Sequence, residues 1–182
     1  MPFPRATRTY DEESLYEYAV AALGRRMRTV AEIKRLLRRR VGAQPHGELL
    51  VEVVVARLKM HRYLNDTSYA ESYARFRRDN EKFGRARVVQ DLKTKGVHGD
   101  IIAKTVNAAY EEINDEKLAR EFLKRKRLAK PVNQRQAARI FRSLLRAGFR
   151  TGVILRILKK WDVDEETLTA LEEESSSAQA GS

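Results

Sequence analysis

Residues 63–97 read YLNDTSYAESYARFRRDNEKFGRARVVQDLKTKGV, and this stretch decides the fold. It opens with a helix start at Asn65-Asp66, continues with aromatic residues at helical spacing, and closes on the basic-glycine-apolar stop Lys95-Gly96-Val97. The same order of signals returns between Ile113 and Phe149 and, in a more divergent form, between Tyr10 and Val41. A repeat of about 50 residues indicates a duplicated supersecondary unit whose copies bury their apolar faces on one another. We therefore expect an elongated tandem array.

Helical periodicity dominates the chain, and strand alternation is nearly absent. Thr9 with Glu12, and Thr29 with Glu32, have the spacing of capping boxes, in which a hydroxyl and a carboxylate satisfy backbone donors at a helix start. The apolar stripes that follow such starts give about nine helices in three triplets. The predicted fold class is all-α, with three three-helix modules in tandem, and the acidic segment from Asp164 to Glu173 is a candidate for an extra C-terminal helix.

The repeat also divides the chain into parts. Residues 1–61 form a first three-helix module with a flexible N-terminus, residues 62–112 a second module, and residues 113–174 a third module that includes the acidic segment. Residues 175–182 are polar and are predicted to be a disordered tail, because they offer too little apolar surface to bury.

Three local patterns indicate where the cores lie. The segment from Glu48 to His61 is apolar almost all round, which predicts the most buried helix of the first module. Tyr69, Tyr73 and Phe76 lie at i, i+4 and i+7 and are predicted to be core residues of the second module. Gly96 follows an apolar stripe at a position that suits a left-handed helix cap.

The charge of the chain is large and unevenly placed. There are 37 Lys and Arg against 25 Asp and Glu, a net charge of +12. From Trp161 onward there are seven acids and no Lys or Arg, so residues 1–160 carry a net charge of +19. Solvation of helix faces explains any single basic residue but not an imbalance of this size. We therefore expect a polyanionic partner.

The most specific charge pattern is a ridge of four arginines in the third module. Arg135, Arg139, Arg142 and Arg146 fall at i, i+4, i+7 and i+11, along one side of a helix. A solvated face usually carries acids at i+4, and this ridge has none, which favours an external anion. The other basic residues at helical spacing are Arg120, Lys124 and Arg127 in the third module and Arg35, Arg38 and Arg39 in the first. All of these are candidate binding residues, because arginine in particular suits phosphates and carboxylates.

Signatures of an enzyme are weak in this sequence. Glu32-Ile33-Lys34 and Asp91-Leu92-Lys93 resemble the carboxylate-x-Lys of some metal-dependent nucleases, but residues i and i+2 of a helix point to different sides and cannot hold one metal. The three histidines lack ligand spacing, and a phosphate-loop motif is absent. We expect no catalytic residues, no metal and no cofactor.

The sequence also suggests a compartment. It contains no cysteine, which fits a reducing environment. Its longest apolar run, from Leu49 to Ala56, is interrupted by Glu52 and is far shorter than the about 18 residues that a membrane helix needs. We expect a cytoplasmic monomer that does not enter the membrane.

Four motifs carry a family resemblance: Tyr63-Leu64-Asn65-Asp66, Gly84-Arg85, Lys95-Gly96-Val97 and Leu145-Arg146-Ala147-Gly148-Phe149. In this order they resemble the RecX family, bacterial regulators of the RecA recombinase. The resemblance implies three tandem three-helix modules without catalytic residues. It also implies binding in the groove of RecA filaments on single- or double-stranded DNA, with inhibition of strand exchange, ATP hydrolysis and the co-protease function. DNA repair and the SOS response are the processes affected. Arg62, where a glycine is common, and the long Gly42–Gly47 connection depart from the pattern.

Two alternatives remain open at this stage. A stand-alone helical DNA-binding protein would use one basic helix per module, but no Asn or Gln accompanies the arginines in a base-reading set, so its binding would be driven by phosphates and sensitive to salt. The acidic segment is expected to be a solvated helix. The alternative is that it folds against the arginine ridge and competes with the partner.

Overall fold

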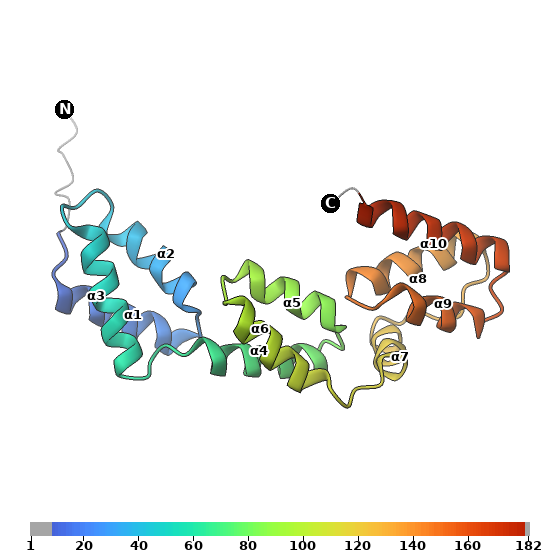
Figure 1. Cartoon of the computed structure of the whole chain (residues 1–182), viewed down its shortest axis with the longest axis horizontal. Helices are drawn as coiled ribbons and strands as arrows, with labels where there is room; N and C mark the ends of the chain where they lie inside the picture. The colour runs from blue at the N-terminus through green and yellow to red at the C-terminus, as the bar shows by residue number, and fades with distance from the viewer. Residues whose placement is uncertain (1–8, 181–182) are drawn as a thin grey trace. The chain divides into compact units, whose positions relative to one another are not determined.

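The computed structural model describes residues 9–180, and all regular secondary structure in this range is α-helical (Figure 1). The helices are α1 (Glu12–Arg25), α2 (Val30–Val41), α3 (Gly47–Met60), α4 (Asp66–Asp79), α5 (Arg85–Thr94), α6 (Gly99–Tyr110), α7 (Asp115–Arg125), α8 (Gln134–Arg146), α9 (Thr151–Lys159) and α10 (Glu165–Ala180). They follow one another as three triplets with α10 as the additional acidic helix. The prediction of an all-α chain of tandem three-helix modules is therefore confirmed.

The chain forms two compact units. Of the described residues, unit 1 comprises 9–70 and 92–101, and unit 2 comprises 71–91 and 102–180. The sequence boundaries near residues 61 and 112 fall in the turns that precede α4 and α7. The helices of the middle triplet contribute residues to both units, so a separate core for residues 62–112 stays a prediction.

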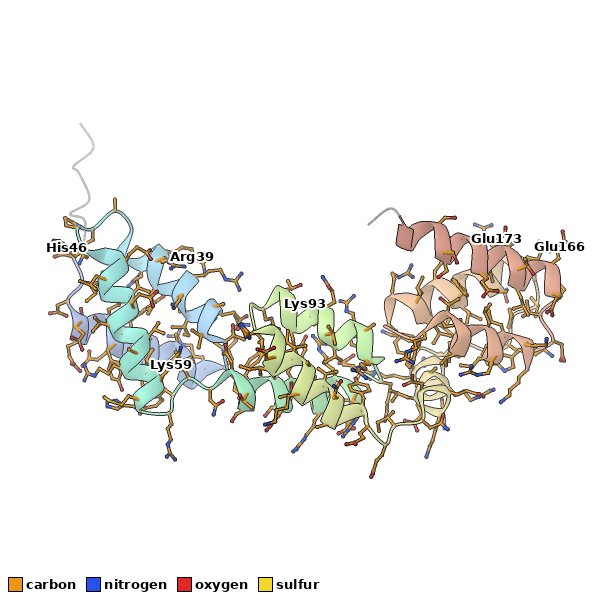
Figure 2. The ribbon with its side chains drawn as sticks, in the orientation of Figure 1. Arg39, His46, Lys59, Lys93, Glu166 and Glu173 are labelled. Atoms are coloured by element: carbon orange, nitrogen blue, oxygen red, sulfur yellow. The ribbon has the colours of Figure 1, made fainter. Side chains whose placement is uncertain are left out.

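Unit 1 is built around α1, α2 and α3, which pack on one another (Figure 1). Its core is apolar, and Leu15, Leu37 and Leu58, one from each helix, are fully buried. Figure 2 shows the side chains on the ribbon, and Arg39, His46 and Lys59 are exposed residues of this unit. Each of these short helices gains stability mainly from the burial of one apolar face, because isolated helices of this length are marginal in water.

The first turn of α2 is held by polar contacts within unit 1. The capping box of Thr29 and Glu32 is present, as predicted from their spacing. Thr29 is fully buried, and its hydroxyl also donates a hydrogen bond of 2.7 Å to the carbonyl of Lys95. Gly96 follows with φ +77°, which confirms the predicted left-handed cap, and a Cβ at this position would lie 2.5 Å from the Cβ of Ala31. Only glycine allows this close packing.

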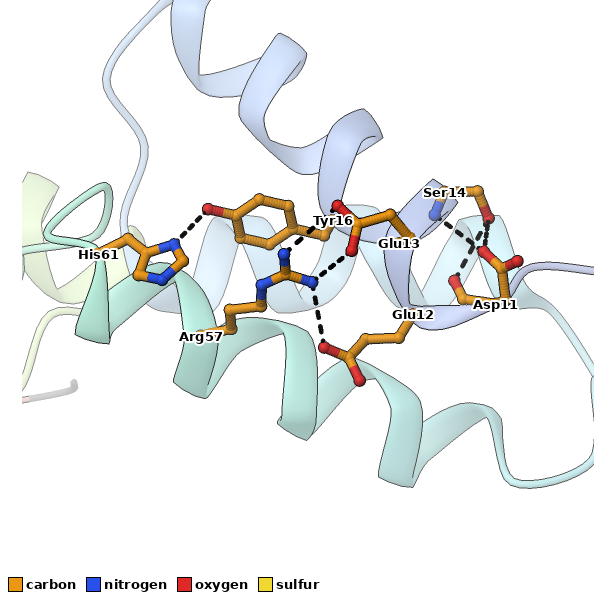
Figure 3. A network of polar contacts seen from close by, with 7 residues as sticks. All are labelled: Asp11, Glu12, Glu13, Ser14, Tyr16, Arg57 and His61. Carbon is orange, nitrogen blue, oxygen red and sulfur yellow. Dashed lines mark hydrogen bonds and ion pairs between the residues drawn. The ribbon is translucent and has the colours of Figure 1, made fainter.

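The predicted capping box at the start of α1 is wrong. The N-cap is Asp11, whose carboxylate accepts a hydrogen bond of 2.9 Å from the backbone N–H of Ser14 (Figure 3). Asp is as good a cap as Thr, and it lies directly before the first helical residue. Glu12 pairs instead with Arg57 of α3, at 3.2 Å.

Two predictions about buried residues are also wrong. Helix α3 buries one face only, because Leu49 and Met60 on the opposite face are 65% and 72% exposed. Among the aromatic residues of α4, Tyr69 is buried, Tyr73 is half-buried and Phe76 is 53% exposed. The three residues lie on one narrow stripe of α4, but their burial decreases along the helix from Tyr69 to Phe76, so only the first part of the stripe is covered.

Unit 2 contains α7, α8 and α9, which pack on one another, and α10 packs on α8 and α9 (Figure 1). Leu168 and Leu171 of α10 are buried in this arrangement. Helix α10 continues to Ala180, so residues 175–180 are helical and not the disordered tail that the sequence predicted. This part of the helix makes a tertiary contact with α9: Ser175 is buried, and its hydroxyl lies 2.9 Å from that of Thr151.

A close backbone approach in unit 2 joins two glycines that lie far apart in the sequence. The N–H of Gly84 donates a hydrogen bond of 2.7 Å to the carbonyl of Ala147. A Cβ on Gly84 would lie 2.3 Å from the carbonyl oxygen of Gly148, which itself has φ +89°. The turn before α5 and the turn after α8 can meet only because neither glycine carries a side chain.

We expect Gly84→Ala to lower the free energy of unfolding by about 1–3 kcal/mol or more, because the new methyl group meets backbone atoms that cannot rotate away. The matched control is Gly24→Ala, since Gly24 lies inside α1 with no atom within 4 Å of the new Cβ. That control should change the stability by less than about 0.5 kcal/mol, because Gly24 is exposed and is the second-last residue of its helix. Urea denaturation followed by circular dichroism measures both changes, and equal stability of the two variants would contradict the close approach.

Candidate nucleic-acid interface

The arginine ridge predicted from the sequence lies on the outer side of α8. Asn133 caps this helix by accepting a hydrogen bond of 2.9 Å from the N–H of Gln136. The opposite side is buried in unit 2 and comprises Ala137, Ile140, Phe141 and Leu144. The four ridge residues Arg135, Arg139, Arg142 and Arg146 are all exposed. The amphipathic character of α8 therefore places the ridge in solvent.

One member of the ridge is already neutralised within the chain. Arg142 donates two hydrogen bonds to the carboxylate of Glu174 on α10, with Nε–Oε1 and Nη2–Oε2 distances of 2.9 and 3.1 Å. This contact lowers the pKa of Glu174 and raises the pKa of Arg142. Among the described residues, Arg135, Arg139 and Arg146 form no ion pair. Three of the four ridge charges thus remain uncompensated.

The position of α10 corrects the expectation of a solvated C-terminal helix. It packs on α8 and α9 through its apolar side, while acidic residues such as Glu166 and Glu173 remain exposed (Figure 2). The acidic segment does reach the ridge, but the described contacts join it only at Arg142. Direct competition between α10 and an external anion is therefore confined to Arg142, which lies between Arg139 and Arg146.

The basic residues of α7 are less available than those of α8. Arg120 pairs with Glu116 at 3.0 Å, and the same carboxylate accepts a hydrogen bond of 2.8 Å from Lys160. Lys160 and then Arg120 lower the pKa of Glu116. Lys124 and Arg127 are exposed, and Arg127 adopts a left-handed φ of +54° just beyond the helix. Arg120 therefore supports the structure of unit 2, whereas the other two residues stay candidates.

A second basic surface lies in unit 1, where α2 and the turn that precedes it form an open groove of about 540 Å³. The groove is lined by Arg26, Arg28, Glu32, Arg35, Arg38 and Arg39. Arg38 also pairs with Glu48 at 2.9 Å, while Arg35 and Arg39 are exposed and have no ion pair among residues 9–180. The structure therefore brings together the three arginines that the sequence selected on α2.

The groove contains two further arginines that helical spacing does not predict. Arg26 and Arg28 lie in the turn between α1 and α2, and the basic run after Gly24 is visible in the sequence. The run alone does not say which way these side chains point, because the turn takes its direction from the packing of both helices. Together with Arg35, Arg38 and Arg39, they bring the number of arginines that line the groove to five, against the single carboxylate of Glu32. That carboxylate already accepts a hydrogen bond from the backbone N–H of Thr29 in the capping box of α2.

The two carboxylate-x-Lys motifs have structural roles. Glu32 caps α2, and Asp91 accepts a hydrogen bond of 3.0 Å from the Tyr73 hydroxyl and pairs with Arg87 at 3.0 Å. In the part of the chain that the structure describes, no group of three His, Cys, Asp or Glu could hold a metal ion. Over the same residues, no helix has both the length and the apolar character to cross a membrane.

Comparisons with known proteins point to one family. Residues 65–106 match the family described as RecX, second three-helix domain. The chain is 31% identical over 168 residues to the regulatory protein RecX of Myxococcus xanthus, a match that covers 85% of this chain and 89% of the relative. It is 33% identical over 157 residues to the regulatory protein RecX of Deinococcus radiodurans, covering 84% of this chain and 72% of the relative.

Some relatives are longer, and the match to the RecX protein of Oceanobacillus iheyensis covers 55% of that protein. The fold is also similar to the crystal structure of RecX from Lactobacillus salivarius. That comparison gives a TM-score of 0.64 and 22% sequence identity, with 83% of this chain and 96% of the other covered. The likeness to a solved structure supports the assignment of the fold.

The contact between Arg142 and Glu174 gives a testable dependence on pH. Because the folded-state pKa of Glu174 lies below its unfolded value, the ion pair stabilises the fold above the unfolded pKa, and this contribution is lost as the pH falls through the folded pKa. We expect Arg142→Gln to raise the pKa of Glu174 toward the ordinary value of a glutamate. An NMR titration of the Glu174 carboxyl carbon measures the change.

The matched control for this titration is Arg139→Gln, which removes a neighbouring ridge charge that has no ion pair among the described residues. It should shift the pKa of Glu174 less than Arg142→Gln does, because it breaks no hydrogen bond to the carboxylate. An unchanged titration in the Arg142 variant would show that α10 does not bind the ridge in solution.

Proposed function

Because this chain belongs to the RecX family of regulatory proteins, we propose that it binds RecA recombinase filaments on DNA and inhibits them. The activities affected are strand exchange, ATP hydrolysis and the co-protease function, and through them recombinational DNA repair and the SOS response. The protein acts in the cytoplasm by occupying the filament and performs no chemistry of its own. The observation that carries this proposal is the exposed ridge of α8, with three arginines that have no ion pair among the described residues.

The dimensions of the ridge suit a nucleic-acid backbone. Arg135 and Arg146 are eleven residues apart, which corresponds to about 16 Å along a helix. One strand of B-form DNA carries a phosphate about every 3.4 Å, so a ridge of this length faces about five phosphates. The planar guanidinium group can donate two parallel hydrogen bonds to a phosphate or to an acidic side chain of a recombinase subunit. Both kinds of group are present in a recombinase–DNA filament.

The groove of unit 1 supplies a second basic surface for the same polymer. Its arginines lie on a different unit from those of α8, so one chain can make two separate contacts. When the first contact forms, the second becomes intramolecular, and the combined affinity exceeds that of either surface. Occupancy of this kind obstructs the second DNA strand and restrains neighbouring recombinase subunits, which is sufficient for inhibition.

A stand-alone DNA-binding protein is the second candidate. The groove of unit 1 favours it, because its lining holds five arginines, of which Arg38 is paired with Glu48, against the one carboxylate of Glu32, and such a surface attracts phosphates without any protein partner. The two candidates differ in the role of the recombinase. The first acts only when recombinase is bound to the DNA. The second binds bare DNA and the recombinase filament with the same affinity.

Charge reversal of the ridge tests the first candidate. We expect Arg135→Glu, Arg139→Glu and Arg146→Glu, combined in one variant, to weaken inhibition of RecA ATP hydrolysis and strand exchange on single-stranded DNA by at least about tenfold, since each lost charged contact is worth about 1.5–3 kcal/mol. Helical content should be unchanged, because these side chains are exposed. Full inhibition by this variant would assign the function to another surface.

The control for this variant reverses three exposed basic residues on other helices. Arg75, Lys93 and Lys104 lie on α4, α5 and α6 and have no ion pair among residues 9–180. Changing all three to Glu alters the net charge by the same amount as the ridge variant. Retained inhibition in this control shows that the position of the charges matters, whereas equal loss in both variants points to general electrostatic attraction.

Salt dependence separates the two candidate functions. We expect binding to bare DNA to weaken linearly in a plot of log K against log salt, and the ridge variant to lower the slope by about 0.9 for each phosphate contact it removes. Fluorescence anisotropy with labelled DNA, with and without recombinase, measures the slopes. Equal affinity for bare and recombinase-coated DNA would favour the stand-alone DNA-binding protein.

A further inference from the structure

Helix α3 of unit 1 carries an apolar stripe on the side that faces away from the core. Leu49, Val53 and Met60 are 65%, 40% and 72% exposed, and Ala56 between them is exposed as well. These four residues, the α3 stripe, follow one another with steps of four, three and four residues, so they lie on one line along the helix. Val51, Val54, Val55 and Leu58 fill the opposite side and are buried in the core. The stripe is thus a second apolar face on a helix that needs only one for folding.

The charged residues beside the stripe are largely paired within unit 1. On one side, Glu52 pairs with Lys34 at 2.7 Å and Glu48 pairs with Arg38 at 2.9 Å. On the other side, Arg57 pairs with Glu12 and Glu13 of α1, and its guanidinium group lies 4.0 Å from the centre of the Tyr16 ring (Figure 3). Lys59 is exposed and has no ion pair among the described residues. A polyanion therefore finds little free positive charge here, and the stripe suits an apolar protein surface.

The spacing of the stripe is the same when read in either direction. A two-fold axis that is perpendicular to α3 and passes beside it, at the level between residues 54 and 55, places Leu49 of one copy against Met60 of a second copy, and Val53 against Ala56. This is the alternation of apolar positions found in coiled coils, with the helices antiparallel, and the small Ala56 lets the two helices approach closely. The apolar positions of the stripe therefore match those of a second, antiparallel copy.

The flanking charges also fit a second copy. In the same antiparallel alignment, Glu52 of one copy lies beside Lys59 of the other, and the symmetry repeats this pair. The Glu52 side chain is 49% exposed despite its contact with Lys34, so it is accessible to a second cation.

We propose that α3 is a self-association surface through which two copies of this chain form an antiparallel helix pair. The face is about 21 Å long and 10 Å wide, from the geometry of a 14-residue helix. Such an area is far below the about 800 Å² per partner of a stable interface, so the dimer is weak and forms at high local concentration. Chains bound side by side on a polymer meet that condition, but the self-association itself does not require the proposed function.

Sedimentation velocity over a wide range of concentrations tests the inference. The average mass of the intact chain should rise from that of the 21.0 kDa monomer toward the dimer as the concentration increases. Leu49→Glu and Met60→Lys, each alone, should weaken self-association by about tenfold or more, because each buries a charge without a partner. The double variant should recover it, because the new carboxylate at position 49 of one copy meets the new ammonium group at position 60 of the other.

The control variant is Val132→Glu, which changes an exposed apolar residue of unit 2 and should leave self-association unchanged. Circular dichroism checks that every variant keeps its helical content. A mass that stays at the monomer value at all concentrations would overturn the inference. A double variant that self-associates no more strongly than the single variants would also overturn it. The same holds if a stripe variant loses binding to the recombinase filament while the original chain is monomeric, because the stripe would then contact the filament and not a second copy.

Discussion

The helices of this chain are short, and the burial of one apolar face per helix is the constraint from which the rest of the structure follows. The helices have 9 to 16 residues, a length at which a helix in water is marginal on its own. Each therefore depends on its neighbours, and charged residues are left on the outer faces. On α8 this division is clean, because Phe141 and Leu144 enter the core while Arg139 and Arg146 project into solvent. The basic surface is thus a consequence of the same amphipathic pattern that folds the unit.

Features set by local sequence could be predicted, and those set by tertiary contacts could not. The capping box of Thr29, the left-handed Gly96 and the order of the helix triplets depend on residues within one or two turns of each other. The exposure of Phe76 and of the α3 stripe depends instead on which part of a helix packs against a neighbour, and an apolar pattern does not specify that. The approach of Gly84 to Gly148 belongs to the second class, although both glycines stand out in the sequence.

The candidate site shows the same division. Periodicity was enough to place Arg135, Arg139, Arg142 and Arg146 on one exposed line, and to group Arg35 with Arg39 on α2. It did not reveal that Arg142 binds Glu174, because this acidic partner lies on another helix. It also did not single out the pair of Glu116 and Arg120, because a separation of four residues is common for ion pairs on any helix surface. Nor did it place Arg26 and Arg28 beside α2, since a turn takes its direction from the helices it joins.

The two kinds of exposed surface on this chain respond to salt in opposite ways. Contacts of the α8 ridge with an anion weaken as ions screen the charges, because the ridge residues are exposed. Contacts of the α3 stripe depend mainly on apolar burial, which salt does not screen and which excluded salts such as sulfate strengthen; salt weakens only the flanking pair of Glu52 and Lys59. A rise in ionic strength therefore weakens attachment to a polyanion but does not weaken apolar association between chains. A regulator that carries both surfaces can be displaced from its polymer by salt while the contact between its copies remains.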